Sequence, residues 1–118
     1  MKQINIGLIG FGNVGAGVVK ILQDNSSLIS ERTGIELKIN KIADIDIKKK
    51  RPISVDAALL TTDPYEIIND GEISIVVEAI GGVDPAKKYI LDAIKAKKHV
   101  VTSNKEVIAK HMEEILEA

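Results

Sequence analysis

Five short stretches of the chain have the apolar character of strands, and segments with helical spacing lie between them. Residues 4–9 and 73–79 are apolar almost throughout, which is typical of strands buried on both faces of a parallel sheet. Residues 36–43 alternate, and this places Leu37 and Ile39, with Lys41 next in register, on one face. The predicted strands span residues 4–9, 36–43, 59–61, 73–79 and 99–102.

Four helices are expected between and after these strands. The first spans residues 13–23, with Val14, Val18, Ile21 and Leu22 on its inner face. We interpret residues 25–34 as a polar connection to the second strand.

Three further helices are predicted from their first residues. Asp63 and Pro64 match an N-cap and a first helical position, and Glu66 would complete a capping box. Asp84 and Pro85 repeat the first two signals, and Ser103 precedes the last apolar-periodic segment. Two apolar helix faces are expected, formed by Tyr89, Ile90, Ala93 and Ile94 and by Val107, Ile108, Met112, Ile115 and Leu116.

Alternating strands and helices predict an α/β fold with a doubly wound parallel sheet and right-handed crossovers. The expected strand order is 3-2-1-4-5, in a three-layer αβα arrangement. A ligand would bind at the carboxyl ends of strands one and four, where the strand order reverses. The 118 residues are expected to form one domain.

The glycines at Gly10, Gly12 and Gly15 form a Gly-x-Gly-x-x-Gly motif between the first strand and the first helix. In a dinucleotide-binding motif, the first glycine makes the tight turn and the second lets the backbone approach a pyrophosphate. The third lets the helix pack closely on the strand. A glycine-rich turn without a ligand is the alternative, but the strand–turn–helix context favours dinucleotide binding. The residues between the glycines, Phe11, Asn13 and Val14, are included in the expected cofactor site.

Composition narrows the function classes. Net charge is −1, so a nucleic-acid partner is not favoured, and the absence of cysteine excludes disulfides and thiolate metal sites. No metal site is visible in the sequence. Residues 4–9 are too short for a membrane span and the N-terminus lacks a signal-peptide pattern, so a cytoplasmic protein is expected.

Asp44 follows the second predicted strand, where an acidic residue can accept hydrogen bonds from an adenosine ribose. It lies 29 positions after Gly15, beyond the usual spacing of about 20. Asp46 is a competitor, and a solvated loop aspartate is the alternative. The basic run at residues 48–51 is either a solvated loop or a clamp for the 2′-phosphate of NADP. A carboxylate at Asp44 would repel that phosphate, so NAD is favoured over NADP.

Lys105 is the catalytic candidate, because a lysine in the first turn of a helix opposes the helix dipole and stability alone would favour an acid there. An exposed surface lysine is the alternative. Glu78 ends an apolar strand, so it is either exposed at the sheet edge or paired. His99 is interpreted as structural, at the amino end of the fifth strand.

Together these motifs resemble homoserine dehydrogenase over essentially the whole chain. The segments that carry the resemblance are 7–15, 60–63, 75–82 with Pro85 and Ala86, and 99–105. Within them, Val-Val-Glu-Ala-Ile-Gly-Gly and His-Val-Val-Thr-Ser-Asn-Lys are far more specific than the glycine motif.

The resemblance implies an NAD(P)-dependent oxidoreductase that interconverts homoserine and aspartate 4-semialdehyde, on the pathway to threonine and methionine. It implies that Lys105 binds or polarises the reacting oxygen. Gly81 and Gly82 would lie along the cofactor. Apart from the resemblance, Ala79, Ile80 and Thr102, with Ser103 next to it, are expected contacts because they end strands at the carboxyl edge of the sheet. Members of the family continue into a substrate-binding and dimerisation domain, so this chain is expected to be the cofactor domain alone, inactive by itself, of a homodimeric enzyme.

Two other functions stay open from the residues. A stand-alone NAD-sensing module would need no substrate lysine. A methyltransferase would use its glycine-rich loop and the acidic residue after strand two to bind a methyl donor.

Overall fold

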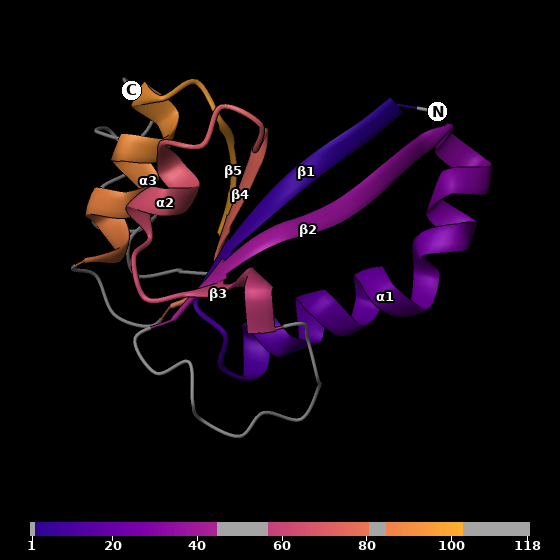
Figure 1. Cartoon of the computed structure of the whole chain (residues 1–118), viewed down its shortest axis with the longest axis horizontal. Helices are drawn as coiled ribbons and strands as arrows, with labels where there is room; N and C mark the ends of the chain where they lie inside the picture. The colour runs from indigo at the N-terminus through magenta and orange to yellow at the C-terminus, as the bar shows by residue number, and fades with distance from the viewer. Residues whose placement is uncertain (1, 45–56, 81–84, 103–118) are drawn as a thin grey trace.

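The computed structural model describes residues 2–44, 57–80 and 85–102, which form a five-stranded parallel sheet (Figure 1). The strand order is β3-β2-β1-β4-β5, which confirms the predicted doubly wound α/β topology. The strands are β1 (Lys2–Ile9), β2 (Ile35–Ala43), β3 (Leu60–Thr61), β4 (Ile75–Glu78) and β5 (His99–Thr102). A short 3₁₀ turn, η1 (Ala57–Leu59), leads into β3.

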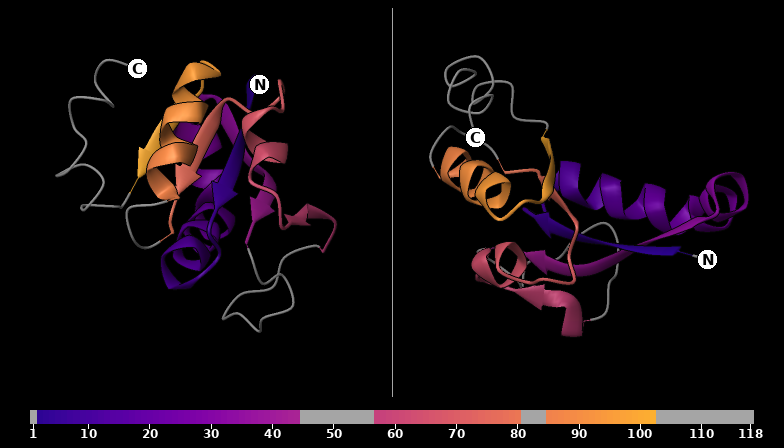
Figure 2. Two further views of the ribbon diagram at one scale, coloured as in Figure 1. Left: turned by 90° about the vertical axis from the view of Figure 1, so that its left-hand side faces the viewer. Right: turned by 90° about the horizontal axis from the view of Figure 1, so that it is seen from above.

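Helices lie on both faces of the sheet, as Figures 1 and 2 show. Helix α1 (Asn13–Thr33) covers one face, while α2 (Tyr65–Ile68) and α3 (Ala86–Lys95) cover the other. Successive residues of β1 supply the two cores because strand side chains alternate between faces. Leu8 packs with Val19 of α1, and Ile9 packs with Ile67 of α2. The predicted three-layer arrangement is therefore present.

Helix α1 is longer than the sequence pattern predicts. It continues to Thr33, so the polar connection expected at residues 25–34 is wrong. Residues 25–33 are mostly exposed and include no proline or glycine, so nothing interrupts the helical hydrogen bonds. The helix ends where Gly34 adopts the left-handed conformation, with φ of 71°, and donates its amide to the Ser30 carbonyl.

A register shift in β2 moves Lys41 to the face opposite the predicted one. Ile6 pairs with Ile39, but Gly7 pairs with Lys41, so one extra residue bulges between them. Ile39 therefore packs on the α1 side, while Lys41 forms an ion pair of 3.7 Å with Glu66 of α2. The alternation that predicted Lys41 on the Leu37 and Ile39 face does not survive the bulge.

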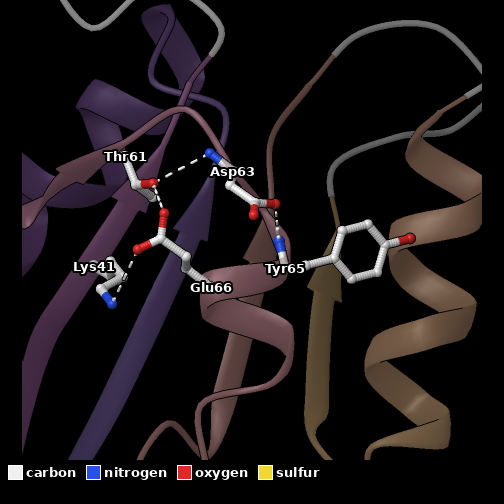
Figure 3. Close-up of polar contacts among 5 residues, drawn as sticks. All are labelled: Lys41, Thr61, Asp63, Tyr65 and Glu66. Carbon is white, nitrogen blue, oxygen red and sulfur yellow. Dashed lines mark hydrogen bonds and ion pairs between the residues drawn. The ribbon is translucent and has the colours of Figure 1, made fainter.

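The predicted capping box at the start of α2 is only half present (Figure 3). The N-cap of α2 is Pro64 and not Asp63 as predicted, but the Asp63 Oδ1 accepts the Tyr65 amide at 2.9 Å at the start of the helix. Glu66 does not reach back to the Asp63 amide as predicted. Its carboxylate instead accepts the Thr61 hydroxyl and pairs with Lys41. The Asp63 amide donates to the Thr61 hydroxyl at 3.2 Å, so Thr61 takes the place that the pattern assigned to Glu66.

Candidate functional site

The glycine-rich loop connects β1 to α1 at the carboxyl end of the sheet. Gly10 has a φ of 100°, a conformation that side chains rarely adopt. A Cβ on Gly10 would lie 2.7 Å from the Ile80 side chain and 2.9 Å from the Ala79 carbonyl. Gly10 also donates its amide to the Ala43 carbonyl at 2.7 Å. The turn predicted at Gly10 is thus held tightly between the ends of β2 and β4.

Gly12 and Gly15 differ in what surrounds them. A Cβ on Gly15 would collide with the Gly10 carbonyl oxygen and come within 3.4 Å of Leu8. A Cβ on Gly12 would meet no protein atom within 4 Å. Gly15 therefore serves the packing of α1 on β1, as predicted, while the space beside Gly12 is open to an approaching group.

Helix α1 begins beside this open space. Gly12 is its N-cap and supplies no side-chain hydrogen bond to the first turn, which carries no acidic residue. The first amides of a helix, together with its dipole, favour an anion at such an end. The exposed Gly12 and this helix end together form a cradle that suits a pyrophosphate.

Asp44 lies directly after β2, half-buried beside the loop. Its Oδ2 accepts the Phe11 amide at 2.9 Å, and its own amide donates to the Thr61 carbonyl at 3.0 Å. The hydrogen bond from Phe11 holds the carboxylate beside the glycine-rich loop, at the strand end where an acidic residue can bind ribose hydroxyls. The long Gly15–Asp44 spacing arises from the extra turns of α1.

A cavity of about 440 Å³ joins these elements. Six of the predicted cofactor contacts line it: Gly10, Phe11, Gly12, Asp44, Ala79 and Ile80. It is also lined by Thr62, Pro64, Pro85 and Tyr89, which the sequence analysis did not assign to the site. The signal that could have found the two prolines is the Asp-Pro pair, which occurs in the sequence after β3 and again after β4.

A second hollow of about 380 Å³ lies between α1 and β2, lined among others by Val19, Leu37 and Ile39. None of the predicted cofactor contacts lines it. The cavity beside the glycine-rich loop is therefore the candidate site.

Gly15 and Thr102, both within the described part of the chain, are predicted contacts that do not line the cavity. Asn13 and Val14 occupy the first turn of α1, and Gly15 packs beneath it. Thr102 ends β5. Four residues lie outside the part of the chain that the structure describes: Gly81, Gly82, Ser103 and Lys105. The basic run at residues 48–51 also lies outside it.

Glu78 ends β4 and is buried, with only 1% of its surface exposed. Its Oε1 accepts the Thr102 hydroxyl and its Oε2 accepts the Ile80 amide, each at 2.8 Å. Of the two alternatives left by the sequence, pairing is therefore the one realised. His99 is exposed at the start of β5, at the amino end of the sheet as predicted.

Two tyrosines hold α2 against α3 at the cavity wall. The Tyr65 hydroxyl donates to Asp92 at 2.5 Å, and the Tyr65 and Tyr89 rings meet edge to face at 5.8 Å. Burial first, and then the hydrogen bond to Asp92, raises the pKa of Tyr65 from 10.0 to about 12. Tyr89 itself lines the cavity, so this contact fixes part of its wall.

Among the described residues, no helix is both long and apolar enough to span a membrane.

Comparison with known proteins identifies the family to which this chain belongs. The family model for the NAD-binding domain of homoserine dehydrogenase matches residues 10–118. The homoserine dehydrogenase of Bacillus subtilis is 43% identical over 98% of this chain, and that of Neisseria gonorrhoeae is 42% identical over 98%. The chain spans 27% and 26% of their respective lengths.

Solved structures give the same result. Homoserine dehydrogenase from S. aureus superposes with a TM-score of 0.92 at 40% identity, over 99% of this chain and 30% of that one. The enzyme from Thiobacillus denitrificans superposes with a TM-score of 0.87 at 40% identity, over 99% of this chain and 27% of that one.

Proposed function

The chain belongs to the family of homoserine dehydrogenase NAD-binding domains, and we propose that it forms the cofactor half of that enzyme. The reaction is the interconversion of L-homoserine and NAD(P)⁺ with aspartate 4-semialdehyde and NAD(P)H. The observation that carries the proposal is the open space beside Gly12, in a cavity bounded by the glycine-rich loop and Asp44.

Different described residues would contact different parts of a bound dinucleotide. Gly12 and the start of α1 would hold the pyrophosphate, and Asp44 would accept the hydroxyls of the adenosine ribose. Ala79 and Ile80, at the end of β4, would bound the second half of the cofactor. When bound, the nicotinamide supplies the hydride chemistry, which the side chains of the protein do not provide.

Lys105 is proposed as the group that binds and polarises the reacting oxygen of the substrate. This role comes from its match to the Asn-Lys segment of the family, because the residue lies outside the described structure. The substrate-binding and dimerisation parts, and a homodimeric enzyme in the cytoplasm, belong to the proposed whole protein, of which the chain spans about a quarter.

Cofactor selectivity is proposed to favour NAD over NADP. The Asp44 carboxylate lies at the cavity and would repel a 2′-phosphate on the ribose it binds. The basic run at residues 48–51 would act in the opposite sense. Calorimetric titration of the chain with NADH, NADPH and S-adenosylmethionine tests this assignment. NADH should bind most tightly; tighter NADPH binding would contradict the role of Asp44, and a preference for S-adenosylmethionine would contradict the proposed function.

The chain by itself should bind cofactor without oxidising homoserine. Hydride transfer requires the substrate within about 3–3.5 Å of the nicotinamide and a positioned group to accept the hydroxyl proton. Lys105 would supply one wall of such a site. Steady-state assays with homoserine and NAD at high protein concentration test this prediction. Turnover by the wild-type chain that disappears in Lys105→Ala would show instead that the 118 residues suffice for catalysis.

A stand-alone NAD-sensing module is the second function left open by the sequence. The relatives are dehydrogenases, which does not favour it. In a protein that includes the substrate domain, Lys105→Ala should abolish turnover and leave cofactor affinity intact. A sensing module has no turnover to lose.

A further inference from the structure

The carboxylate of Glu78 is buried at the point where three strands end. In register, Glu78 pairs with Ile9 of β1 on one side and with Thr102 of β5 on the other. Ile9 is the residue before Gly10, so the backbone of Glu78 lies one strand spacing, about 5 Å, from the strand residue that leads into the glycine-rich loop. The proposed cofactor contacts thus surround Glu78, although it does not line the cavity itself.

Each oxygen of Glu78 holds a different part of the cavity edge. Oε2 accepts the Ile80 amide and so fixes the turn of Ala79 and Ile80, both of which line the cavity. Oε1 accepts the Thr102 hydroxyl and ties the end of β5 to the end of β4. The turn of Ala79 and Ile80 packs against Gly10, because a Cβ placed on Gly10 would contact both residues. Glu78 therefore controls the shape of the second half of the site.

The charge of Glu78 is not cancelled within the described chain. Its two oxygens accept hydrogen bonds from neutral groups only, the Ile80 amide and the Thr102 hydroxyl. Among residues 2–44, 57–80 and 85–102, no lysine or arginine forms an ion pair with it. Burying a carboxylate without a cation is costly, and neutral residues could tie two strand ends together at lower cost. Packing alone therefore does not explain a carboxylate at position 78, and a functional role accounts for it better.

Such a charge distinguishes the two redox forms of a nicotinamide cofactor. The oxidised ring carries a positive charge and the reduced ring is neutral, while the rest of the molecule is the same. The second half of a dinucleotide site lies at the ends of β4 and β5. A buried negative charge beneath these ends attracts the oxidised ring and has no comparable effect on the reduced one, and it is weakly screened there.

We propose that Glu78 is a positioning and selectivity residue that holds the ends of β4 and β5 together and raises the affinity of the site for oxidised relative to reduced cofactor. The proposal rests on the proposed function, since it requires a nicotinamide cofactor in this cavity. Bound reduced cofactor becomes a stronger hydride donor, because the site favours the form left after transfer. This effect assists reduction of the semialdehyde.

The test is the ratio of the dissociation constants for NAD⁺ and NADH, measured calorimetrically on the 118-residue chain. Glu78→Gln keeps the side-chain shape and removes the charge, so affinity for NAD⁺ should fall about fivefold relative to NADH. Glu72→Gln is the matched control, since Glu72 is exposed before β4, and its ratio should equal that of the wild type. Thr102→Val removes the hydroxyl and keeps the carboxylate, so both affinities should fall together and the ratio should stay.

The outcomes separate this inference from the proposed function. Wild-type chain that binds neither form contradicts the proposed function. Wild-type chain that binds both, with an unchanged ratio in Glu78→Gln, overturns the role of Glu78 alone. If Glu78→Gln is unstable, its thermal unfolding in saturating NAD⁺ and NADH gives the ratio, because a ligand stabilises the native state according to its affinity. A variant that stays unfolded with both forms would show that the carboxylate serves the fold only, and would also overturn the proposal.

Discussion

The two ends of the central sheet are built differently. At the amino end, hydrogen bonds within the protein connect the loops to the strands. The Ser74 amide donates to the Asn5 carbonyl, and the His99 amide donates to the Ser74 carbonyl. The Lys98 ammonium donates to the carbonyls of Asp70 and Ile73. At the carboxyl end, a cavity separates the loops, and Gly12 has no neighbour for a side chain to meet. Both ends are hydrogen-bonded, but the carboxyl end, held by contacts of Gly10, Asp44 and Glu78, also leaves an open space that a ligand can enter.

Gly12→Val is expected to have the largest effect and to act on binding alone. The added side chain would occupy the space proposed for the pyrophosphate, so NADH affinity should fall by about a hundredfold or more, ~2.7 kcal/mol. The free energy of unfolding should change by about 1 kcal/mol or less, since the cost is that of a poorer N-cap. Titration and chemical denaturation measure the two effects.

Gly17→Val is the control for that substitution, because a Cβ on Gly17 also meets no atom within 4 Å but lies inside α1, outside the cavity lining. It should retain NADH binding. Equal affinities of the wild type and Gly12→Val would remove the pyrophosphate from this position.

Lys98→Met should show the reverse behaviour at the amino end. The variant keeps the apolar stem of the side chain and loses two hydrogen bonds from a charged group, at 2.6 and 2.7 Å. The free energy of unfolding should fall by about 2 to 3 kcal/mol, with NADH affinity unchanged. The neighbouring exposed Lys97→Met should alter stability by about 0.5 kcal/mol or less. A loss of cofactor affinity in Lys98→Met would break the separation between the two ends.

Stability should fall in strong alkali because of Tyr65, at the cavity wall. Its pKa is about 12 in the folded chain against 10.0 as the ordinary value, so the unfolded chain loses this proton first as pH rises. The stabilisation is complete below pH 10 and is lost between pH 10 and 12. It amounts to about 1 to 2 kcal/mol after allowance for solvent around the half-buried ring.

Denaturant unfolding of the wild type and of Tyr65→Phe across this pH range isolates the contribution. The difference in stability between the two proteins should narrow as the pH rises from 10 to 12. A constant difference would contradict the assignment.

Asp44→Asn should have the smallest effect and act on selectivity. The amide oxygen can still accept the Phe11 hydrogen bond, but the charge that repels a 2′-phosphate is gone. The preference for NADH over NADPH should narrow by about fivefold, ~1 kcal/mol. Asp24→Asn, on the exposed side of α1, is the control. An unchanged preference in Asp44→Asn would assign cofactor selectivity to other residues.

The elements with local signals were predictable. The alternation of strands with helices predicted the order of strands in the sheet. The glycine motif after an apolar strand, together with the strand ends, predicted six residues that the structure brings together in the cavity: Gly10, Phe11, Gly12, Asp44, Ala79 and Ile80. The polar second half of α1 was missed because its residues face solvent and show no apolar periodicity, although their backbone hydrogen bonds are those of any helix. Tyr89 was missed because contact across the cavity leaves no local pattern, whereas Pro64 and Pro85 belong to a repeated Asp-Pro pair that was interpreted only as a helix start.

The sequence by itself determined the fold class, the strand order, the conformational demand at Gly10 and the family, because each depends on local periodicity, on backbone freedom or on similarity along the chain. Only the tertiary structure decided which face Lys41 occupies, since a bulge against β1 sets it. It also decided that the Glu78 carboxylate is buried between the ends of β4 and β5. Both depend on which strands become neighbours, and a side chain meets those partners only after residues far apart in the chain have been brought together.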